Sequence, residues 1–405
     1  MQTDRTRIDA AALRRMYENV SSLPALREKY AGERNDGGEL SIETLPVLTK
    51  DELAGALDDI VAAARSRSIG AYLYGSGGTT SKPKLSVVPT GMFVAAIRRE
   101  WQPLSPNDML VNFYSTGQLW SSHNFFNMLA HESGAVVLPL GSVEGDELGE
   151  WLDVMERFGV TALNATPSQI AHLLEHCEAT GRKPPAIEKL LWTGEAYGDR
   201  AAELTRSMLP GAKIYGCYGS TETWVIGANG PDCALNVFHV MPYQHVELVD
   251  GVVLVTTTDP DCINPILRYQ VGDRGEFVQC PCGRSEPGLR VLGRADTQVK
   301  FISVLVAPTE LANIARRITG VRDVQLAFLD HAHPNETLQV RLLLQPGADA
   351  AAVTGLVRHE LLTEVYRLRA VVDRAPRALE VIAVDRLAVN ARTRKTPLYV
   401  SEMRG

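Results

Sequence analysis

The sequence predicts an α/β fold, because apolar segments of strand length alternate with helical segments over the first half of this 405-residue chain. Two further observations set the domain plan. The stretch from about 233 to 292 is rich in strand patterns, and strands and helices alternate again after it. We therefore predict a large N-terminal domain of parallel sheets with crossover helices over residues 1–295, and a small α+β domain over 296–405.

The segment before the sheet, residues 8–56, is predicted to form short docking helices. Apolar residues recur on one helical face at Leu13, Met16, Tyr17 and Val20. Thr49 followed by Glu52 is the pattern of a capping box, which starts a helix.

The sheet itself is predicted from a series of apolar runs. Strands are expected at 68–74, 84–88, 109–115, 134–141, 160–166 and 187–194. Helices are expected at 91–101, 124–131, 150–158, 167–179 and 199–208. Because this alternation favours a parallel sheet, ligands should gather at the carboxyl ends of the strands.

Beyond Cys233 the pattern changes to alternating apolar and polar residues. Residues 245–259 contain an Asp250-Gly251 pair that predicts a hairpin turn, and 266–280 continue the β-rich region. We interpret this part as a separate, smaller β subdomain. In the C-terminal domain the longest expected helix runs from Ala350 to Leu368.

Composition excludes several classes of function. A net charge of −7 argues against a nucleic-acid partner, and no apolar run approaches the ~20 residues that a membrane span needs. The charged N-terminal segment lacks the apolar centre of a secretory signal, and six cysteines in so long a chain do not form a disulfide scaffold. A cytoplasmic location is expected.

The stretch YGSGGTTSKPK, residues 74–84, has the composition of a polyphosphate-binding loop. Gly77 and Gly78 leave backbone N–H groups accessible to an anion, the hydroxyl side chains add donors, and Lys82 and Lys84 add positive charge. The pattern fits neither the Walker A motif nor the dinucleotide fingerprint. A flexible surface turn is the alternative interpretation of such a stretch.

Four further motifs follow in the chain. YGCYGSTET (215–223) presents Glu222, RYQVGDRGEF (268–277) presents Asp273, VLGRADTQVKF (291–301) contains Arg294 and Asp296, and NARTRKTPLYV (390–400) contains Lys395. In this order the set resembles the adenylate-forming superfamily of acyl- and aryl-CoA ligases, adenylation domains and luciferases. The N-terminal text YENVSSLPALREKY and LPVLTKDEL is similar to the phenylacetate-CoA ligase branch.

The resemblance implies an ATP site. Its expected ATP-binding residues are Ser76, Gly77, Gly78, Thr79, Thr80, Lys84, Glu195, Tyr218, Gly219, Ser220, Asp273 and Arg294. Glu222 would hold Mg²⁺, Thr221 would lie beside the α-phosphate, Asp273 would accept hydrogen bonds from the ribose, and Lys395 would stabilise the developing charge. The alternatives are a carboxylate at a helix start, a turn-forming Asp, a surface ion pair for Arg294 and a solvated basic loop.

The resemblance also implies a mobile C-terminal lid domain that rotates at Asp296 between the adenylation and thioester-forming states. The chain departs from the family pattern at Thr297, where a second Asp is common, and at Ser81 and Ser303, where glycines are common. These departures leave adenylation better supported than transfer to CoA.

The acid pocket is expected to draw its wall from three aromatic-rich segments. The predicted wall residues are Tyr114, Trp120, His123, Phe125, Trp192, Gly194, Tyr218 and Trp224. Such a wall suits a planar aryl acid. For each aromatic residue a plain core position is the alternative, as is a satisfied core histidine for His123.

Cys280 and Cys282 in CPCGR, together with Cys233 and His239, form a Cys₃His set that suits a structural zinc site. Some members of the branch that the chain resembles have such a site. Buried free cysteines that act as small apolar residues are the alternative.

From these motifs we expect an ATP- and Mg²⁺-dependent ligase that adenylates a small aromatic carboxylic acid and transfers it to CoA. The alternatives are a stand-alone enzyme that loads a carrier protein, a diazotase of natural-product biosynthesis that activates nitrite for an aryl amine, and a nucleotide-binding module without catalysis. The branch implies a homodimer.

Overall fold

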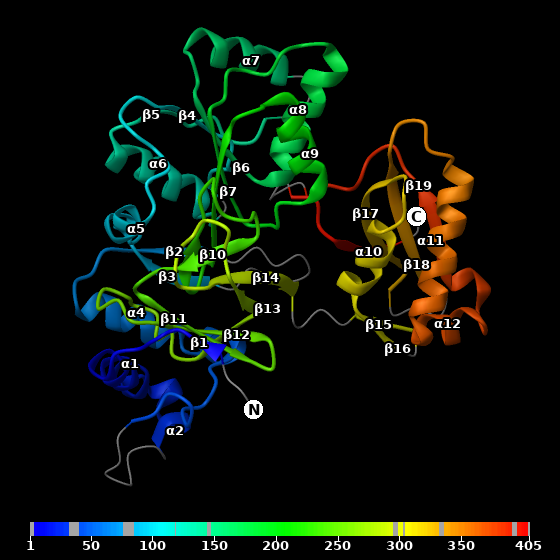
Figure 1. Cartoon of the computed structure of the whole chain (residues 1–405). Coiled ribbons are helices and arrows are strands. Elements are labelled where there is room, and N and C mark those ends of the chain that lie inside the picture. Colours follow the sequence, from blue (N-terminus) through cyan, green and yellow to red (C-terminus); the bar gives the residue numbers. More distant parts are fainter. Residues whose placement is uncertain are drawn as a thin grey trace. The chain divides into compact units, whose positions relative to one another are not determined.

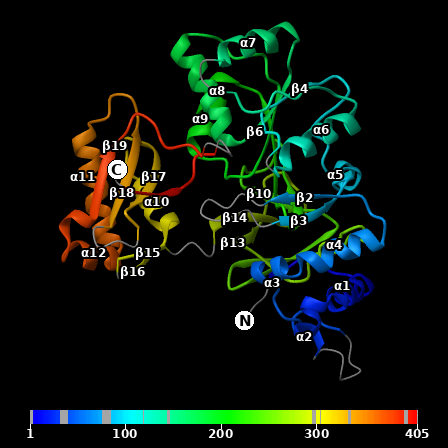
Figure 2. The same cartoon turned by 180° about the vertical axis from the view of Figure 1, so that it is seen from behind.

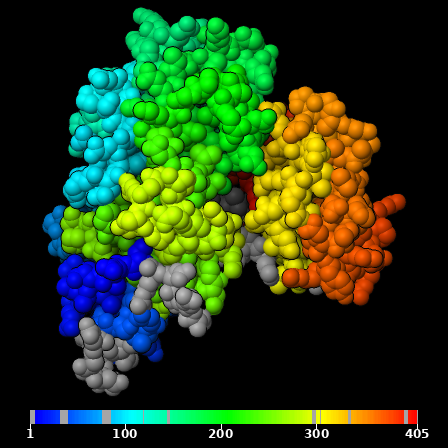
Figure 3. All heavy atoms as spheres, viewed as in Figure 1, coloured from blue at the N-terminus to red at the C-terminus, as the bar shows by residue number. Residues whose placement is uncertain are grey.

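The computed structural model describes residues 4–31, 40–75, 85–117, 119–143, 147–294, 299–302, 304–331, 336–390 and 395–403. The chain divides into two compact units, Met1–Ala295 and Asp296–Gly405 (Figure 1). Figure 3 shows the heavy atoms of one face of the molecule, coloured along the sequence as in Figure 1.

The N-terminal segment folds into short helices, as the sequence predicts. They are α1 (Ala10–Ser22), η1 (Pro24–Leu26), α2 (Arg27–Tyr30), α3 (Lys50–Gly55) and α4 (Leu57–Ser66). The capping box of Thr49 and Glu52 is present at the start of α3. The expected apolar face of α1 is buried in a core shared with the β-rich strands of this unit.

A parallel set of strands forms the centre of the first unit. In spatial order it contains β5 (Val136–Leu138), β4 (Met109–Asn112), β6 (Ala162–Ala165), β7 (Lys189–Thr193) and β8 (Lys213–Ser220). Helices α5 (Val94–Glu100) and α6 (Ser122–Ser133) cover one face, and α7 (Leu148–Arg157), α8 (Pro167–Thr180) and α9 (Asp199–Met208) cover the other (Figure 1, Figure 2). The predicted α/β architecture is confirmed.

The β-rich stretch continues this same sheet. Its strands are β9 (Trp224–Ala228), β10 (Val237–Val240), β11 (Gln244–Val249), β12 (Val252–Thr257), β13 (Tyr269–Val278) and β14 (Gly288–Arg294). Within the described ranges the sheet has twelve strands, and β1 (Asp4–Arg5) lies at one edge. Strand β10 links this stretch to the parallel strands, because it pairs with β9 on one side and with β14 on the other. Strands β11, β12 and β13 share a core of their own with the N-terminal helices, and the predicted subdomain stays a prediction.

Two local predictions in this unit hold. Asp250 (φ 51°) and Gly251 (φ 75°) both take the left-handed conformation that a tight hairpin turn requires. Strands β2 (Ala71–Gly75) and β3 (Leu85–Pro89) pair antiparallel and flank residues 76–84, which lie outside the described part.

The second unit is a small α+β fold. Its elements are β15 (Val299–Phe301), β16 (Val304–Val306), α10 (Pro308–Arg316), β17 (Val321–Leu329), β18 (Thr337–Leu344), α11 (Ala350–Glu364), α12 (Tyr366–Val372), η3 (Pro376–Ala378), β19 (Leu379–Ala383) and β20 (Tyr399–Glu402). The main sheet has the order β19-β18-β17-β20. The single helix expected from Ala350 to Leu368 is interrupted at Val365 (φ −104°, ψ 83°), whose buried side chain packs in the core shared by both helices.

Candidate nucleotide, acid and metal sites

A tight turn between β8 and β9 presents the predicted motif residues of 218–222. Ser220 and Thr223 close the turn, with their hydroxyl oxygens 3.0 Å apart and the Thr223 N–H 3.2 Å from Ser220 Oγ. Gly219 is required here, because a Cβ at this position would lie 2.0 Å from the Trp224 carbonyl oxygen. The turn leaves Thr221 half-buried and brings Glu222 into the protein.

Glu222 is a buried carboxylate, with 7% of its surface exposed. Its backbone is held by Asn264, whose amide nitrogen donates to the Glu222 carbonyl oxygen at 2.9 Å. The described parts of the chain offer its carboxylate neither a hydrogen-bond donor nor an ion-pair partner. Since a buried charge without a partner is costly, this carboxylate fits a divalent cation that also binds substrate phosphates.

Tyr218, Asp273 and Arg294 meet beside this turn. The Tyr218 hydroxyl donates to Asp273 Oδ2 at 2.7 Å, and Arg294 Nη1 lies 3.4 Å from Asp273 Oδ1. Asp273 in β13 and Arg294 in β14 are direct cross-strand partners. Burial, and after it the Asp273 charge, raise the pKa of Tyr218 well above its usual range, so this phenol stays protonated and keeps donating.

Glu195 has a partner of its own at the start of α8. Its Oε1 accepts a hydrogen bond from the Ser168 backbone N–H at 2.6 Å, next to the Thr166–Gln169 capping box of that helix. Gly194 precedes it with φ 91°, a conformation that glycine tolerates best. The Glu195 carboxylate therefore stabilises the first turn of α8 by accepting this backbone N–H.

An aromatic layer lies between the parallel strands and α6. Tyr114 stacks on Phe126 (centroids 5.3 Å apart), Phe126 contacts Phe125 (5.0 Å), and Phe125 meets Trp224 edge-on (5.5 Å). The Tyr114 hydroxyl donates to the Ala165 carbonyl at 2.9 Å and accepts from the Thr193 N–H at 2.9 Å, so this ring reaches across the end of β6. His123 Nδ1 lies 2.6 Å from the Tyr114 carbonyl oxygen. Tyr114, His123, Phe125 and Trp224 are thus brought together.

The structure corrects the placement of Trp192. Side chains alternate between the faces of a strand, so Leu191 faces the aromatic layer while Trp192 faces α8 and α9. There Trp192 packs against Tyr197 and Phe238 at centroid distances of 5.4 and 5.7 Å and is 2% exposed. Trp120 precedes α6 and is half-buried, and its backbone N–H donates to the Gly117 carbonyl.

Some predicted site residues fall outside the described ranges. They are Ser76, Gly77, Gly78, Thr79, Thr80, Lys84 and Asp296. Lys395 belongs to the second unit, where it is half-buried and its carbonyl oxygen accepts from the Asn390 N–H at 2.9 Å.

A second cluster joins Cys233, His239, Cys280 and Cys282. Their ligand atoms all lie within 4.8 Å of one another, and His239 Nε2 is 3.1 Å from Cys282 Sγ. His239 lies in β10, which pairs with β14, and the segment that leads into β14 at Gly288 contains Cys280 and Cys282. This pairing brings the distant halves of the set together. Tetrahedral zinc separates its sulfur ligands by roughly 3.8 Å, so the residues present fit the metal after small side-chain adjustments.

Protonation in this cluster is uneven. Burial raises the pKa of Cys233 to about 12. Burial also acts to raise that of Cys280, but hydrogen bonds from the backbone N–H groups of Cys282 and Ala234 and from neighbouring thiols outweigh it, so the pKa of Cys280 is lowered. Burial, together with Arg284, lowers the pKa of His239, which favours the neutral imidazole that binds metals.

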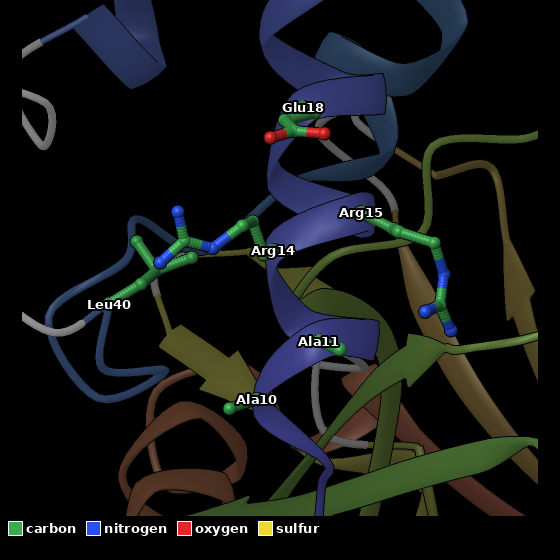
Figure 4. Close-up of a pocket in the computed structure, with 6 residues that line it drawn as sticks. All are labelled: Ala10, Ala11, Arg14, Arg15, Glu18 and Leu40. Atoms are coloured by element: carbon green, nitrogen blue, oxygen red, sulfur yellow. The ribbon is translucent and has the colours of Figure 1, made fainter.

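Two surface cavities of the described part lie along α1, away from these residues. One of about 440 Å³ is formed along α1 by Ala10, Ala11, Arg14, Arg15, Glu18 and Leu40. Figure 4 shows the Arg14 side chain extending toward Leu40 while Arg15 points to the other side of the helix. None of the predicted site residues lines it, and we assign it no role.

Sequence reasoning missed Asn264 and Phe126. Asn264 fixes the Glu222 backbone across 42 positions in sequence, and Phe126 joins Tyr114 to Phe125. Neither residue stands in a recognisable motif, so only the tertiary contacts identify them.

Known proteins resemble this chain in sequence. The family model of the AMP-binding enzymes matches residues 11–255, and the chain belongs to this family. It is 23% identical over 347 residues to the 4-chlorobenzoate–CoA ligase of Pseudomonas sp. (strain CBS-3), covering 73% of this chain and 62% of that ligase. The chain thus spans less than two thirds of the length of that relative.

Solved structures support the fold. A 2-hydroxyisobutyryl-CoA ligase in the postadenylation state, in complex with 2-HIB-AMP, aligns with a TM-score of 0.70 at 17% identity, covering 97% of this chain and 88% of that one. The anthranilate CoA ligase AuaEII in complex with anthranoyl-AMP aligns with a TM-score of 0.55 at 16% identity, over 80% and 64% of the two chains.

Among the described residues, no helix is both long and apolar enough to cross a bilayer.

Proposed function

We propose that this protein is an ATP-dependent ligase that activates a small aromatic carboxylic acid as its acyl-adenylate and then transfers the acyl group to CoA. The observation that carries the proposal is Glu222, a buried carboxylate with no cationic partner in the described structure, placed on a rigid turn beside Tyr218 and Asp273. Membership of the AMP-binding enzyme family supports the nucleotide.

The first step is an adenylyl transfer. A carboxylate oxygen of the acid forms a bond to the α-phosphorus of ATP, and the bond from that phosphorus to the pyrophosphate oxygen breaks. Because the substrate supplies the nucleophile, the protein's task is to position both reactants and stabilise charge. Asp273, oriented by Tyr218 and Arg294, would accept hydrogen bonds from the ribose hydroxyls. Glu222 would hold Mg²⁺, which neutralises phosphate charge when bound.

The outer phosphates are assigned to the loop of residues 76–84, on the strength of its glycines, hydroxyls and lysines. Lys395 would stabilise the charge that develops at the α-phosphate. In the second step the CoA thiol loses its proton and its sulfur bonds to the acyl carbon, while the bond from that carbon to the phosphate oxygen breaks and AMP leaves. This step would need the C-terminal unit to rotate at Asp296.

An aromatic acid is supported by the layer of Tyr114, Phe125, Phe126 and Trp224, whose flat faces suit a ring. The names of two similar proteins, a 4-chlorobenzoate and an anthranilate CoA ligase, agree with this class of acid. The membership of the phenylacetate-CoA ligase branch rests on the N-terminal motifs and stays a prediction.

A panel of aryl and alkyl acids tests the function by ATP–pyrophosphate exchange, with and without CoA. Exchange that depends on an acid, followed by loss of free CoA thiol, is the expected result. Transfer only to a carrier-protein pantetheine would identify a loading enzyme, and AMP release only with nitrite plus an aryl amine would identify a diazotase. ATP binding with no pyrophosphate release under any condition would contradict all three.

The Cys₃His cluster is proposed as a structural zinc site, held by Cys233, His239, Cys280 and Cys282. Zinc there would tie the loop before β14 to β10, and Phe238 of β10 contacts Tyr218 at a centroid distance of 5.6 Å. The metal would therefore help to hold the nucleotide-site tyrosine in place, without taking part in the chemistry. The homodimer and the cytoplasmic location stay predictions.

A further inference from the structure

Asn164 lies in the sheet directly beneath the aromatic layer. It belongs to β6, where it is in register with Asn112 of β4 and Leu191 of β7. Ala162, two positions earlier, packs in the same core as Tyr114, Phe125 and Trp224, and side chains two apart in a strand share a face. The side chain of Asn164 therefore points toward α6, next to the place where Tyr114 crosses the end of β6.

The amide of Asn164 is buried without a partner. Its exposed fraction is 0%, and neither Nδ2 nor Oδ1 has a hydrogen-bond partner among the residues that the structure describes. Its neighbour Asn112 is fully used, since Nδ2 donates to the His123 carbonyl and to Asn127 Oδ1 while Oδ1 accepts from the Tyr114 N–H. A buried amide that forms no hydrogen bond is expensive, so such groups normally face a ligand or an internal water.

The indole N–H of Trp224, in the same aromatic layer, is also buried without a hydrogen-bond partner among the described residues. Trp224 is 7% exposed. Trp224 also takes φ 61°, a left-handed conformation that costs energy for a large side chain and that tends to occur at functional sites. The Asn164 amide and the Trp224 indole N–H therefore lie unpaired beside an aromatic layer, and this combination suits a ligand ring that carries polar atoms.

We propose that Asn164 is a specificity-determining residue of the acid pocket, and that the preferred acid carries a hydroxyl or amino substituent on its ring that hydrogen-bonds the Asn164 amide. This inference deepens the proposed function and rests on it. A ring hydroxyl can donate to Oδ1 and accept from Nδ2, so it can satisfy both atoms, whereas a ring amino group can donate to Oδ1. An unsubstituted ring would leave both atoms unpaired, and the site would discriminate against it.

The test measures kcat/KM for acid-dependent ATP–pyrophosphate exchange with benzoate, the three hydroxybenzoates and the three aminobenzoates. The wild-type protein is expected to prefer at least one substituted acid over benzoate by about tenfold or more. Asn164→Leu should lower kcat/KM for that acid by about tenfold to a hundredfold, while benzoate is unchanged or improved. Asn164→Ala, which adds no bulk, should lose the same preference if the leucine variant does not fold.

Leu191→Met is the matched control, because residue 191 is the register neighbour on the same face and the change conserves volume. It should shift all acids equally. If the Asn164 variants lower activity by the same factor for every acid, Asn164 serves an internal water or the fold alone, and the inference is overturned while the proposed function stands. If no acid of any class supports exchange with the wild-type protein, both fail.

Discussion

At the scale of single residues, the two acidic side chains of the candidate site differ in their hydrogen-bond and ion-pair partners. No cationic side chain among the described residues pairs with Glu222, whereas Asp273 is already held by Tyr218 and Arg294. This contrast separates Glu222, which we propose as a metal ligand, from Asp273, whose carboxylate is already oriented by its neighbours. Such orientation lowers the cost of binding, because the acceptor oxygens need not be reorganised when the ligand arrives.

Glu222→Gln should reduce the rate of acid-dependent pyrophosphate exchange by about 10²- to 10³-fold, since the metal loses its anionic ligand. The free energy of unfolding should stay the same or rise, because an unpaired buried charge is removed. Exchange kinetics and thermal unfolding measure the two effects. The control is Glu276→Gln, at an exposed carboxylate paired with Arg290. A fully active Glu222→Gln protein would exclude the metal role.

At the scale of elements, strand ends are tied together by side chains from distant segments. Asp108, just before β4, accepts from the Ser105 N–H and hydroxyl at 2.7 Å and from Lys189 of β7 at 2.7 Å. Tyr114 forms the corresponding tie at the opposite end of these strands. The two ties fix the strand ends between which the aromatic layer lies.

Asp108→Asn should lower the free energy of unfolding at pH 7 by about 1–3 kcal/mol, because it leaves the Lys189 charge unpaired. Burial acts to raise the pKa of Asp108, but the hydrogen bonds from Lys189 and Ser105 outweigh it and lower that pKa. A carboxyl with a lowered folded-state pKa stabilises the fold above its unfolded value of about 3.9 and loses this contribution as the pH falls below it. Denaturant titrations of both proteins should therefore begin to converge near about pH 4 and meet only below the lowered folded-state pKa of Asp108. A constant difference down to pH 2 would contradict the ion-pair account.

The metal cluster also acts between elements. Removal of zinc with a chelator, or Cys280→Ser, should release one equivalent of metal and lower the free energy of unfolding by about 2 kcal/mol or more. Metal analysis of the purified protein and thermal unfolding measure these effects. Cys177→Ala, in α8 and outside the cluster, should keep its zinc. If the wild-type protein retains no metal after expression in zinc-supplemented medium, the proposed zinc site is contradicted.

At the scale of the whole molecule, two units contribute to one proposed reaction. The first unit contains the turn of Glu222, the Asp273 cluster and the aromatic layer, whereas Lys395 belongs to the second. A reaction that needs residues from both units depends on domain closure, so its two half-reactions should be separable by mutation.

Lys395→Ala should lower the rate of adenylation by about a hundredfold, while thioester formation from a supplied acyl-adenylate is little changed. Single-turnover assays of each half-reaction separate the two rates. Lys300→Ala, at an exposed lysine of β15 in the same unit, is the control and should leave adenylation intact. Equal losses in both half-reactions would point to damage of the unit as a whole instead of a role at the α-phosphate.

The sequence by itself determined the α/β class, the order of strands and helices, and the motifs that carry the proposed chemistry. These are local properties: hydrophobic periodicity, capping patterns such as Thr49–Glu52, and the glycine that the turn at 219 requires. It also suggested the Cys₃His set from residue type and spacing, whereas the pairing of β10 with β14 is what places these side chains together.

Only the tertiary structure decided what depends on register and on face. It joined the β-rich strands to the main sheet through β10, and it placed Trp192 on the α8–α9 side, away from Tyr114 and Phe125. It also showed that Asn164, which stands in an apolar run and belongs to no motif, has a buried amide without a hydrogen-bond partner among the described residues. A shift of one position in a strand moves a side chain to the opposite face, and composition alone does not record which residue faces which.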